Sequence, residues 1–273
     1  MNERGGNSLN IESSSSTGTV LVTCTGRTAT VTLNRPESMN AINPEMLNDF
    51  INALKDVSEN EEIDVVILKG NGKAFSSGGD IKMMLGSDEE NGFDNLMDGI
   101  SELVTTLYFM PKLTISQIHG AVAGLGLSIA LATDYLIADS ESKVAMNFIG
   151  IGLIPDGGGH FFLERRLGEV GAKELIWEGK VLTAKEAKEK GLIHEVVEGS
   201  LEQAVEKKVQ TWLKSPVQAM IKTKKILSEN NRPLLIKLLE IEKAAQMKMR
   251  QTEDHKEGIL AFVEKRKPVF IGK

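Results

Sequence analysis

The pattern of apolar and polar residues predicts β-structure at the start of the chain, followed by a helix. Polar and apolar residues alternate over 19–33 on either side of Gly26, which predicts a β-hairpin. In the next segment, apolar residues recur at helical spacing behind Asn43 and Pro44. We therefore expect a helix with Asn43 as its N-cap and Pro44 at its first position.

Short apolar strands and glycine-rich turns continue to about residue 200, and helical patterns dominate the rest of the chain. Strands are expected at 64–70, 112–120, 134–139 and 142–147, and a buried helix at 123–134. This order predicts a mixed α/β core over 19–200 and an α-helical region over 201–273. The polar, Ser- and Gly-rich segment 1–18 is expected to be a disordered tail.

Composition narrows the class of protein. The 273 residues are 41% hydrophobic and 26% charged, with a formal net charge of −6, so a basic face for nucleic acid is not expected. The single cysteine, Cys24, rules out a disulfide within the chain, and the four histidines lack metal-type spacing. The chain has no apolar run of membrane-spanning length and no signal-like start. We therefore expect a cytoplasmic protein with no metal and with no membrane or nucleic-acid partner.

Two glycine segments are candidates for chemistry. The stretch "GKAFSSGGDI" (72–81) fits neither the Walker A pattern nor the dinucleotide pattern, which leaves the backbone of Gly78 and Gly79 as its functional feature. The stretch "GAVAGLGLSIALA" (120–132) places Gly124 where a helix begins. The first N–H groups of a helix lack internal partners, so the two segments together could form an oxyanion hole. Close packing of a buried helix would also require glycine there, and the two interpretations stay open.

Five motifs in order give the chain a specific resemblance. "NRPESMNAIN", "GKAFSSGGDI", "IHGAVAGLG", "IGLIPDGGG" and "EGILAFVEKRKPVF" follow one another as in the crotonase (enoyl-CoA hydratase/isomerase) superfamily, over nearly the whole chain after the tail. The resemblance implies an α/β fold, a crotonase-like spiral of ββα units with a C-terminal α-helical trimerisation region, assembled as a homotrimer or hexamer. It also implies acyl-CoA thioester substrates, with coenzyme A as part of the substrate and no separate cofactor. Its implied oxyanion donors are the N–H groups of Gly79 and Leu125.

The same resemblance implies contacts with the acyl-CoA. These involve Met39, Ala41, Ser77, Gly79, Ile81, Leu125, Ser128, Phe148 and Lys265. Lys265 resembles a lysine that reaches the CoA phosphates from a neighbouring subunit, although a solvated lysine is an equal interpretation. Met83, Met84, Leu85, Phe93 and Met97 either line the acyl end of the cleft or pack as ordinary helix residues.

The chain departs from the hydratase pattern at two positions. Ser128 and Phe148 stand where hydratases resembling this chain carry their two glutamates. Serine is a poor general base at neutral pH, and phenylalanine cannot move protons. Asp156 in "LIPDGGG" remains, as in the isomerase branch that includes the phenylacetate-pathway epoxide isomerase and the Δ3,Δ2-enoyl-CoA isomerases. One carboxylate with an oxyanion hole suffices to move a proton from the α to the γ carbon. Asp156 could also be the N-cap of a helix over 157–167, alone or in addition.

Three functions stay open at this stage. The first is double-bond isomerisation of an enoyl-CoA by Asp156, Gly79 and Leu125. The second is hydration by an enoyl-CoA hydratase of fatty-acid or aromatic-acid degradation, in which Asp156 works with another group. The third is an acyl-CoA-binding homologue without catalysis. Asp80 and Asp134 are interpreted as structural residues.

Overall fold

In the computed structural model of the chain, residues 12–14, 18–81 and 90–273 are described. The main sheet has seven strands in the order β1-β2-β3-β4-β5-β7-β10, and a second sheet has the order β6-β8-β9. The strands of the main sheet are β1 (Glu12–Ser14), β2 (Val20–Thr25), β3 (Thr28–Leu33), β4 (Val65–Gly70), β5 (Leu113–Ile118), β7 (Tyr135–Asp139) and β10 (Glu195–Val197). The strands of the second sheet are β6 (Ala121–Ala123), β8 (Lys143–Ala145) and β9 (Val181–Thr183).

The predicted hairpin and first helix are confirmed. Strands β2 and β3 pair antiparallel with Thr25 opposite Thr28, around the left-handed Gly26 (φ 57°). Helix α1 (Pro44–Glu59) begins as expected, because the Asn43 side chain accepts a hydrogen bond from the Met46 amide and Pro44 occupies the first position.

The predicted ββα repetition is visible where the chain crosses from one sheet to the other. Strand β5 ends at Ile118, and the chain turns at Gly120 (φ 57°) into β6 and then into helix α4 (Leu125–Leu131). A Cβ on Gly120 would lie 1.9 Å from the Lys73 carbonyl oxygen, so only glycine fits this crossing. Strands β7 and β8 repeat the same step one strand further on, and β8 pairs parallel with β6.

Helices cover both faces of the parallel strands. Along β4, Val66 and Leu68 belong to the large core, whereas Val65 packs in a second cluster with residues of α7 (Leu201–Leu213). The large core includes residues of α1, α3 (Glu90–Phe109), α4 and α5 (Gly159–Glu178). The remaining short elements are η1 (Pro36–Ser38), η2 (Phe148–Ile151) and α6 (Ala184–Glu189).

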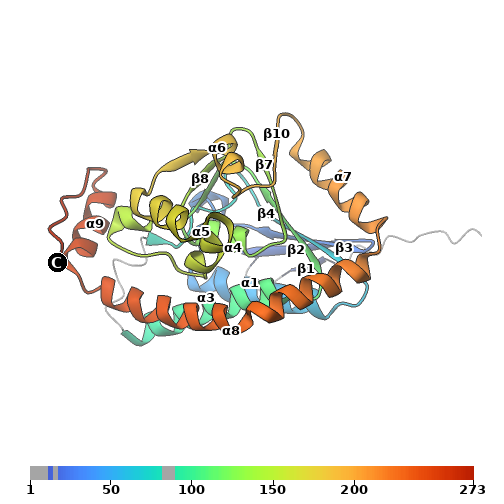
Figure 1. The fold of residues 1–273 in the computed structure, drawn as a ribbon, viewed down its shortest axis with the longest axis horizontal. Helices are drawn as coiled ribbons and strands as arrows, with labels where there is room; N and C mark the ends of the chain where they lie inside the picture. The colour runs from blue at the N-terminus through green and yellow to red at the C-terminus, as the bar shows by residue number, and fades with distance from the viewer. Residues whose placement is uncertain (1–11, 15–17, 82–89) are drawn as a thin grey trace, which may run out of the picture.

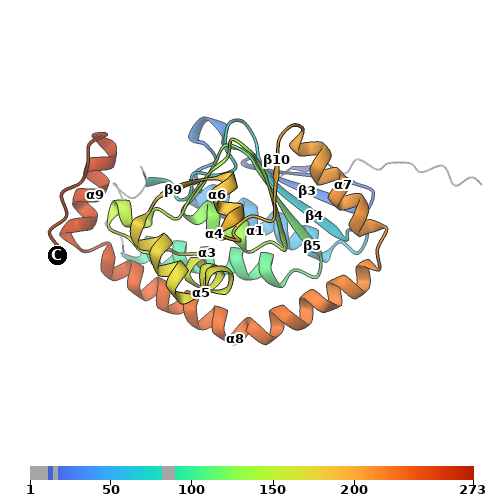
Figure 2. The ribbon, with the colours of Figure 1, turned by 45° about the horizontal axis from the view of Figure 1, so that its top comes forward.

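The C-terminal helices extend along the molecule. Helix α8 (Val217–Met249) passes α3, and α9 (Glu253–Val263) lies at the far end with the C-terminus (Figure 1). Because proline disfavours a helix interior, the sequence suggests one helix before Pro233 and another after it, but α8 continues through this proline. Proline removes one hydrogen bond of the ladder and clashes with the preceding turn, and Figure 2 shows α8 bent near its middle.

Part of the segment predicted to be a tail joins the sheet. Glu12–Ser14 forms β1 and pairs antiparallel with β2, Ser13 lying opposite Val22. The prediction of disorder is therefore wrong for these three residues. Backbone groups at the free edge of β2 accept a short strand whatever its side chains, so a polar composition does not exclude pairing.

Candidate active site

The first glycine segment is fixed by backbone hydrogen bonds just after β4. The Ile42 amide donates to the Gly78 carbonyl (2.8 Å), and the Asp80 amide donates to the Ile42 carbonyl (3.1 Å). The two bonds form an isolated parallel β-bridge between Ile42 and Gly79, and neither of them uses the N–H of Gly79. Gly78 has φ 98°, a conformation that favours glycine, and this bend sets the direction of the Gly79 amide.

The second glycine segment begins α4. Gly124 (φ 52°) is the N-cap, its amide donates to the Ala145 carbonyl (3.0 Å), and its carbonyl accepts from the amides of Leu127 and Ser128. All seven residues of α4 are buried. Leu125 is the first residue of the helix, so its N–H has no acceptor within α4 and lies at the positive end of the helix.

The two segments lie against each other. A Cβ on Gly78 would stand 2.8 Å from the Ala123 carbonyl oxygen and 3.3 Å from the Leu125 amide nitrogen. Within residues 12–14, 18–81 and 90–273, the N–H groups of Gly79 and Leu125 have no backbone acceptor. Two free amides on adjacent, rigid segments can chemically hold a developing oxyanion.

Asp156 lies beside the first turn of α4. The Ser128 hydroxyl donates to the Asp156 carbonyl oxygen (2.7 Å), which ties the two segments together. A Cβ on the next residue, Gly157, would be 2.6 Å from Leu125 Cδ1. The structure therefore brings Leu125, Ser128 and Asp156 together, as the sequence predicts for a site.

The carboxyl group of Asp156 is buried. The residue is 6% exposed. Its pKa is raised well above 3.8, mainly because the carboxyl group is buried and secondly because the negative charge of Glu242 is near. Asp156 Oδ1 has no hydrogen-bond partner among the described residues. A buried acid group with a raised pKa can accept or donate a proton.

The alternative that Asp156 is a helix N-cap is wrong. Helix α5 begins at Gly159, its N-cap is the left-handed Gly158, and no side chain of the cap residue bonds its first turn. The carboxylate of Glu242 from α8 takes that role, since it accepts from the Gly158 amide (2.8 Å) and the His160 amide (3.1 Å). Consecutive glycines let the chain turn once more after Asp156, which moves the start of the helix beyond its reach.

The two positions that lack glutamates are filled by packing groups. Ser128 is fully buried and uses its hydroxyl on the Asp156 carbonyl. Phe148 is 8% exposed, and a Cβ on Gly124 would lie 3.6 Å from its ring. An aromatic ring thus lies against the second glycine segment, where it can contact an apolar ligand but cannot transfer a proton.

Most of the expected CoA-contacting residues in the first glycine segment and the loop before α1 lie together, whereas Lys265 lies apart from them. Met39 adopts a left-handed conformation (φ 51°) and is half-exposed, and its carbonyl accepts from the Ser77 amide (3.0 Å). Ala41 is buried, and Ile81 follows the Gly79 segment directly and is half-buried. Lys265 lies beyond α9 and is exposed, so it belongs to the end of the molecule where the C-terminus lies.

The expected apolar lining is only partly described. Met83, Met84 and Leu85 lie outside the described residues. Phe93 and Met97 of α3 are buried members of the main core. This burial matches the interpretation of ordinary helix packing for these two side chains.

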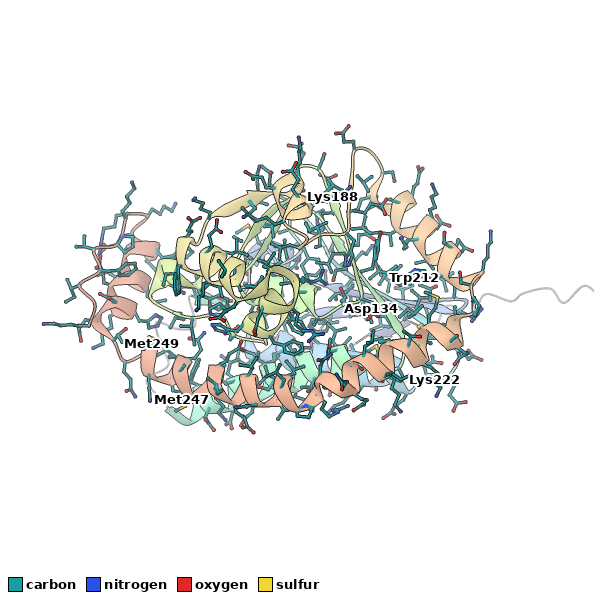
Figure 3. All side chains as sticks on the ribbon, in the orientation of Figure 1. Asp134, Lys188, Trp212, Lys222, Met247 and Met249 are labelled. Atoms are coloured by element: carbon teal, nitrogen blue, oxygen red, sulfur yellow. The ribbon has the colours of Figure 1, made fainter. Side chains whose placement is uncertain are left out.

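Two other acidic residues are fastened into ion pairs, as predicted for structural residues. Asp80 pairs with Arg35 (3.2 Å), which also donates to the Ala41 carbonyl and so fixes the loop beside Gly79. Asp134, labelled in Figure 3, accepts from the Thr114 amide and from Lys224 Nζ of α8 (2.8 Å each).

Sequence reasoning missed two residues of α8 that reach the site. Glu242 and Gln246 are 2% and 1% exposed and contact the loop that carries Asp156. The sequence carries a signal for them, because they follow Leu235 and Leu239 at helical spacing on the buried face of α8. Polar residues within an apolar stripe of a helix indicate buried partners.

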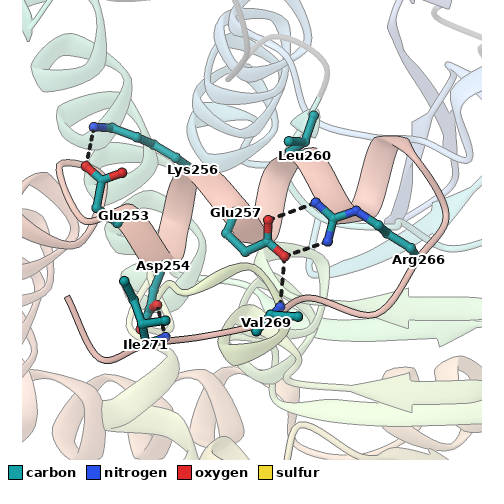
Figure 4. A pocket seen from close by; sticks show the side chains of 8 residues that line it. All are labelled: Glu253, Asp254, Lys256, Glu257, Leu260, Arg266, Val269 and Ile271. Atoms are coloured by element: carbon teal, nitrogen blue, oxygen red, sulfur yellow. Dashed lines mark hydrogen bonds and ion pairs between the residues drawn. The ribbon is translucent and has the colours of Figure 1, made fainter.

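The hollow beside α9 is separate from this site. It has a volume of about 530 Å³ and lies between α9 and the C-terminal segment (Figure 4). Its polar side chains are already paired, since Glu257 accepts from Arg266 and the Val269 amide, and Asp254 accepts from the Ile271 amide. None of the site residues described above lines it, so it is no candidate for the chemistry.

Two further features of the described residues bear on ligands. They contain no group of three or more potential metal-ligating side chains. Within the same residues, no helix combines the length and the apolar character needed to cross a membrane.

Comparison with known proteins identifies the fold and the family. The family model for enoyl-CoA hydratase/isomerase matches residues 25–273. YhaR of Bacillus subtilis (strain 168), provisionally named as an enoyl-CoA hydratase/isomerase, is 47% identical over 247 residues, which cover 90% of this chain and 96% of the relative. The 1,2-epoxyphenylacetyl-CoA isomerase of Escherichia coli (strain K12) is 31% identical over 255 residues, 89% of this chain and 95% of the relative.

A solved structure agrees with these sequence matches. The crystal structure of an enoyl-CoA hydratase from Mycobacterium avium subsp. paratuberculosis K-10 superposes with a TM-score of 0.84 at 29% identity, covering 93% of this chain and 98% of that one. The expected α/β crotonase fold is thereby confirmed. With its motifs, its fold and its match over nearly the whole length, the chain belongs to the enoyl-CoA hydratase/isomerase family, and it is a crotonase-type enzyme.

Proposed function

We propose that this enzyme isomerises the double bond of an enoyl-CoA thioester. The thioester carbonyl oxygen accepts hydrogen bonds from the amides of Gly79 and Leu125. The Asp156 carboxylate removes a proton from the α carbon, and the negative charge passes to that oxygen as an enolate. The same carboxyl group then returns the proton to the γ carbon, so the double bond moves and no atom is gained or lost.

One observation carries this proposal. Asp156 is a buried carboxylic residue whose backbone is tied to helix α4 through Ser128, and the two positions of the hydratase glutamates hold Ser128 and Phe148. A single carboxyl group can shuttle one proton between two carbons, whereas hydration also needs a group that activates water. The relative named trans-2-decenoyl-[acyl-carrier-protein] isomerase, which is 32% identical over 250 residues, supports double-bond isomerisation, whereas other relatives are named hydratases.

The substrate contacts are part of the proposal. The backbone around Met39, Ala41 and Ser77 would hold the CoA, Ile81 and Phe148 would contact the acyl side, and Lys265 would reach CoA phosphates from a neighbouring subunit of a trimer. The proposed chemistry requires no further cofactor, because the backbone amides stabilise the enolate and Asp156 carries the proton.

The substitution Asp156→Asn tests the assignment. We expect a loss of about 10²- to 10⁴-fold in the rate of double-bond shift in a 3-enoyl-CoA, because the amide cannot remove the α proton. Asp98→Asn is a matched control, since Asp98 is 62% exposed on α3 and forms an ion pair with Lys243. An Asp156→Asn variant that keeps the wild-type rate would rule the proposal out.

The pH dependence follows from the same assignment. Removal of the α proton requires the carboxylate, and burial raises the pKa of Asp156. The value of kcat/KM is therefore expected to rise with pH through this raised pKa and to level off above it. Hydration of crotonyl-CoA at a comparable rate, lost in Asp156→Asn, would instead favour the hydratase alternative.

A further inference from the structure

Helix α8 presents two buried polar side chains to the loop that carries Asp156. Glu242 and Gln246 are four residues apart, so they lie on one face of α8. Both are almost fully buried, at 2% and 1% exposure. Long polar side chains are rarely buried to this extent unless they have a specific partner.

Glu242 holds the junction between the loop and α5. Its two oxygens accept from the Gly158 amide (2.8 Å), the His160 amide (3.1 Å) and the His160 ring nitrogen Nδ1 (2.8 Å). Asp156 is two residues before Gly158. The carboxylate of Glu242 thus fixes the backbone directly after Asp156 and also brings a negative charge close to it.

Gln246 contacts Asp156 itself. Its Nε2 donates to the Ile154 carbonyl (2.6 Å) and lies 3.4 Å from Asp156 Oδ2. In the part of the chain that the structure describes, Gln246 Oε1 and Asp156 Oδ1 have no hydrogen-bond partner. The pair therefore retains unused hydrogen-bonding capacity at the carboxyl group.

The two residues act on Asp156 in opposite electrostatic senses. The charge of Glu242 adds to burial in raising the pKa of Asp156, while the hydrogen bond from Gln246 lowers it. The other elements packed here add little charge. Helix α4 and η2 have no titratable side chain, α9 contributes His255 bonded to the Ile151 carbonyl, and Asp94 and Asp98 of α3 are paired with Lys243.

We infer that Glu242 and Gln246 of α8 are positioning residues for Asp156, with Glu242 favouring the uncharged acid and Gln246 favouring the carboxylate. This inference deepens the proposed function and rests on it for its catalytic meaning. Through these two side chains, the C-terminal helix sets the fraction of enzyme in which Asp156 is ready to accept a proton.

A titration without substrate tests the inference. The carboxylic acid band of Asp156 is followed by infrared difference spectroscopy against pH and is assigned by its loss in Asp156→Asn. We expect the midpoint to move to lower pH in Glu242→Gln and to higher pH in Gln246→Met. The acidic limb of kcat/KM for a 3-enoyl-CoA should move in the same two directions.

A control separates this effect from general loosening of the loop. His255→Leu removes another anchor of the same loop, the bond to the Ile151 carbonyl, without removing a group that acts on the Asp156 carboxyl. We expect it to lower stability and leave the midpoint unchanged. Shifts in one direction in both α8 variants, no shift, or an equal shift in the control would overturn the inference.

The test still decides even if Glu242→Gln misfolds or if Asp156→Asn stays active. If Glu242→Gln does not fold, Gln246→Met alone decides, because an unchanged or lowered midpoint in that variant contradicts the inference. The infrared readout needs no turnover, so it can succeed even if Asp156→Asn keeps full isomerase activity. In that outcome the proposed function fails while the influence of α8 on Asp156 stands.

Discussion

The two halves of the candidate site are built in different ways. The half that can hold an oxyanion consists of backbone, with the amides of Gly79 and Leu125 on segments fixed by backbone hydrogen bonds. The half that carries Asp156 is a loop fastened at three points by side chains from α8 and α9, which contact the backbone at residues 151, 154 and 158. In the proposed reaction, anion binding relies on backbone contacts, and proton transfer relies on a loop that the C-terminal helices support.

The two halves are therefore expected to differ in how well they tolerate side-chain substitutions. Backbone amides are indifferent to most side-chain changes, so the oxyanion half tolerates substitution except at its glycines. The carboxyl group of Asp156 contacts Gln246, which is 90 residues away in sequence, and under the inference above its protonation depends on that contact. Changes in α8 can therefore alter the chemistry without touching the glycine segments.

Among the glycine substitutions, the largest effect is expected where the two glycine segments are forced apart. In Gly78→Ala, the new Cβ would approach the Ala123 carbonyl to 2.8 Å in a conformation with φ 98°, so the two glycine segments must separate. We expect kcat to fall by about 10²- to 10³-fold, as when one oxyanion donor is lost. Single-turnover isomerisation of a 3-enoyl-CoA measures it.

The control for that variant is Gly26→Ala. Gly26 also has a positive φ (57°), but a Cβ there would meet nothing within 4 Å. This substitution should cost about 1–2 kcal/mol of stability for the backbone conformation alone and leave kcat unchanged. Equal losses of kcat in both variants would mean that backbone strain, and not the geometry of the site, explains the first result.

A smaller effect is expected from loosening the support of the Asp156 half. A Cβ on Gly258 of α9 would lie 2.7 Å from the backbone of Ile151, so Gly258→Ala forces α9 away from η2. We expect a loss of about 1–3 kcal/mol in unfolding free energy, measured by urea denaturation. Gly150→Ala is the matched control on η2, because a Cβ there meets nothing within 4 Å, and an equal loss in it would refute the packing argument.

The smallest effect concerns the pH dependence of stability. The pKa of Asp156 is raised in the folded state, so the folded protein holds a proton that the unfolded chain has lost. Stability therefore falls as pH rises from 3.8 through the raised pKa, and Asp156→Asn escapes this loss. The melting temperature of the variant should rise relative to that of the wild type as pH increases from 3.8 through the raised pKa, and a pH-independent difference would contradict this account.

The sequence predicted the local features of the fold well. The hairpin at Gly26, the capped start of α1 and the buried α4 each depend on residues adjacent in sequence. The continuity of α8 through Pro233 and the pairing of Glu12–Ser14 were not predicted. In both cases tertiary packing or a free strand edge overrides a local signal.

The candidate site shows the same limit. The neighbourhood of Gly78, Gly124 and Asp156 followed from motifs, and the structure brings these segments together. The capping of α5 by Glu242 in place of Asp156 could not be read from the loop sequence, because the competing carboxylate lies more than 80 residues further along the chain. In the sequence, long-range side-chain contacts of this kind are indicated only weakly, here by two polar residues within an apolar stripe of α8.

The central claim is that the two halves together form and protonate an enolate. Exchange of the α proton of acyl-CoA thioesters in D₂O tests it most directly, because exchange reports enolate formation whatever the net reaction. The account predicts deuterium at the α carbon with the wild-type enzyme and its loss in Asp156→Asn. Tight acyl-CoA binding without any exchange, or undiminished exchange in Asp156→Asn, would contradict it.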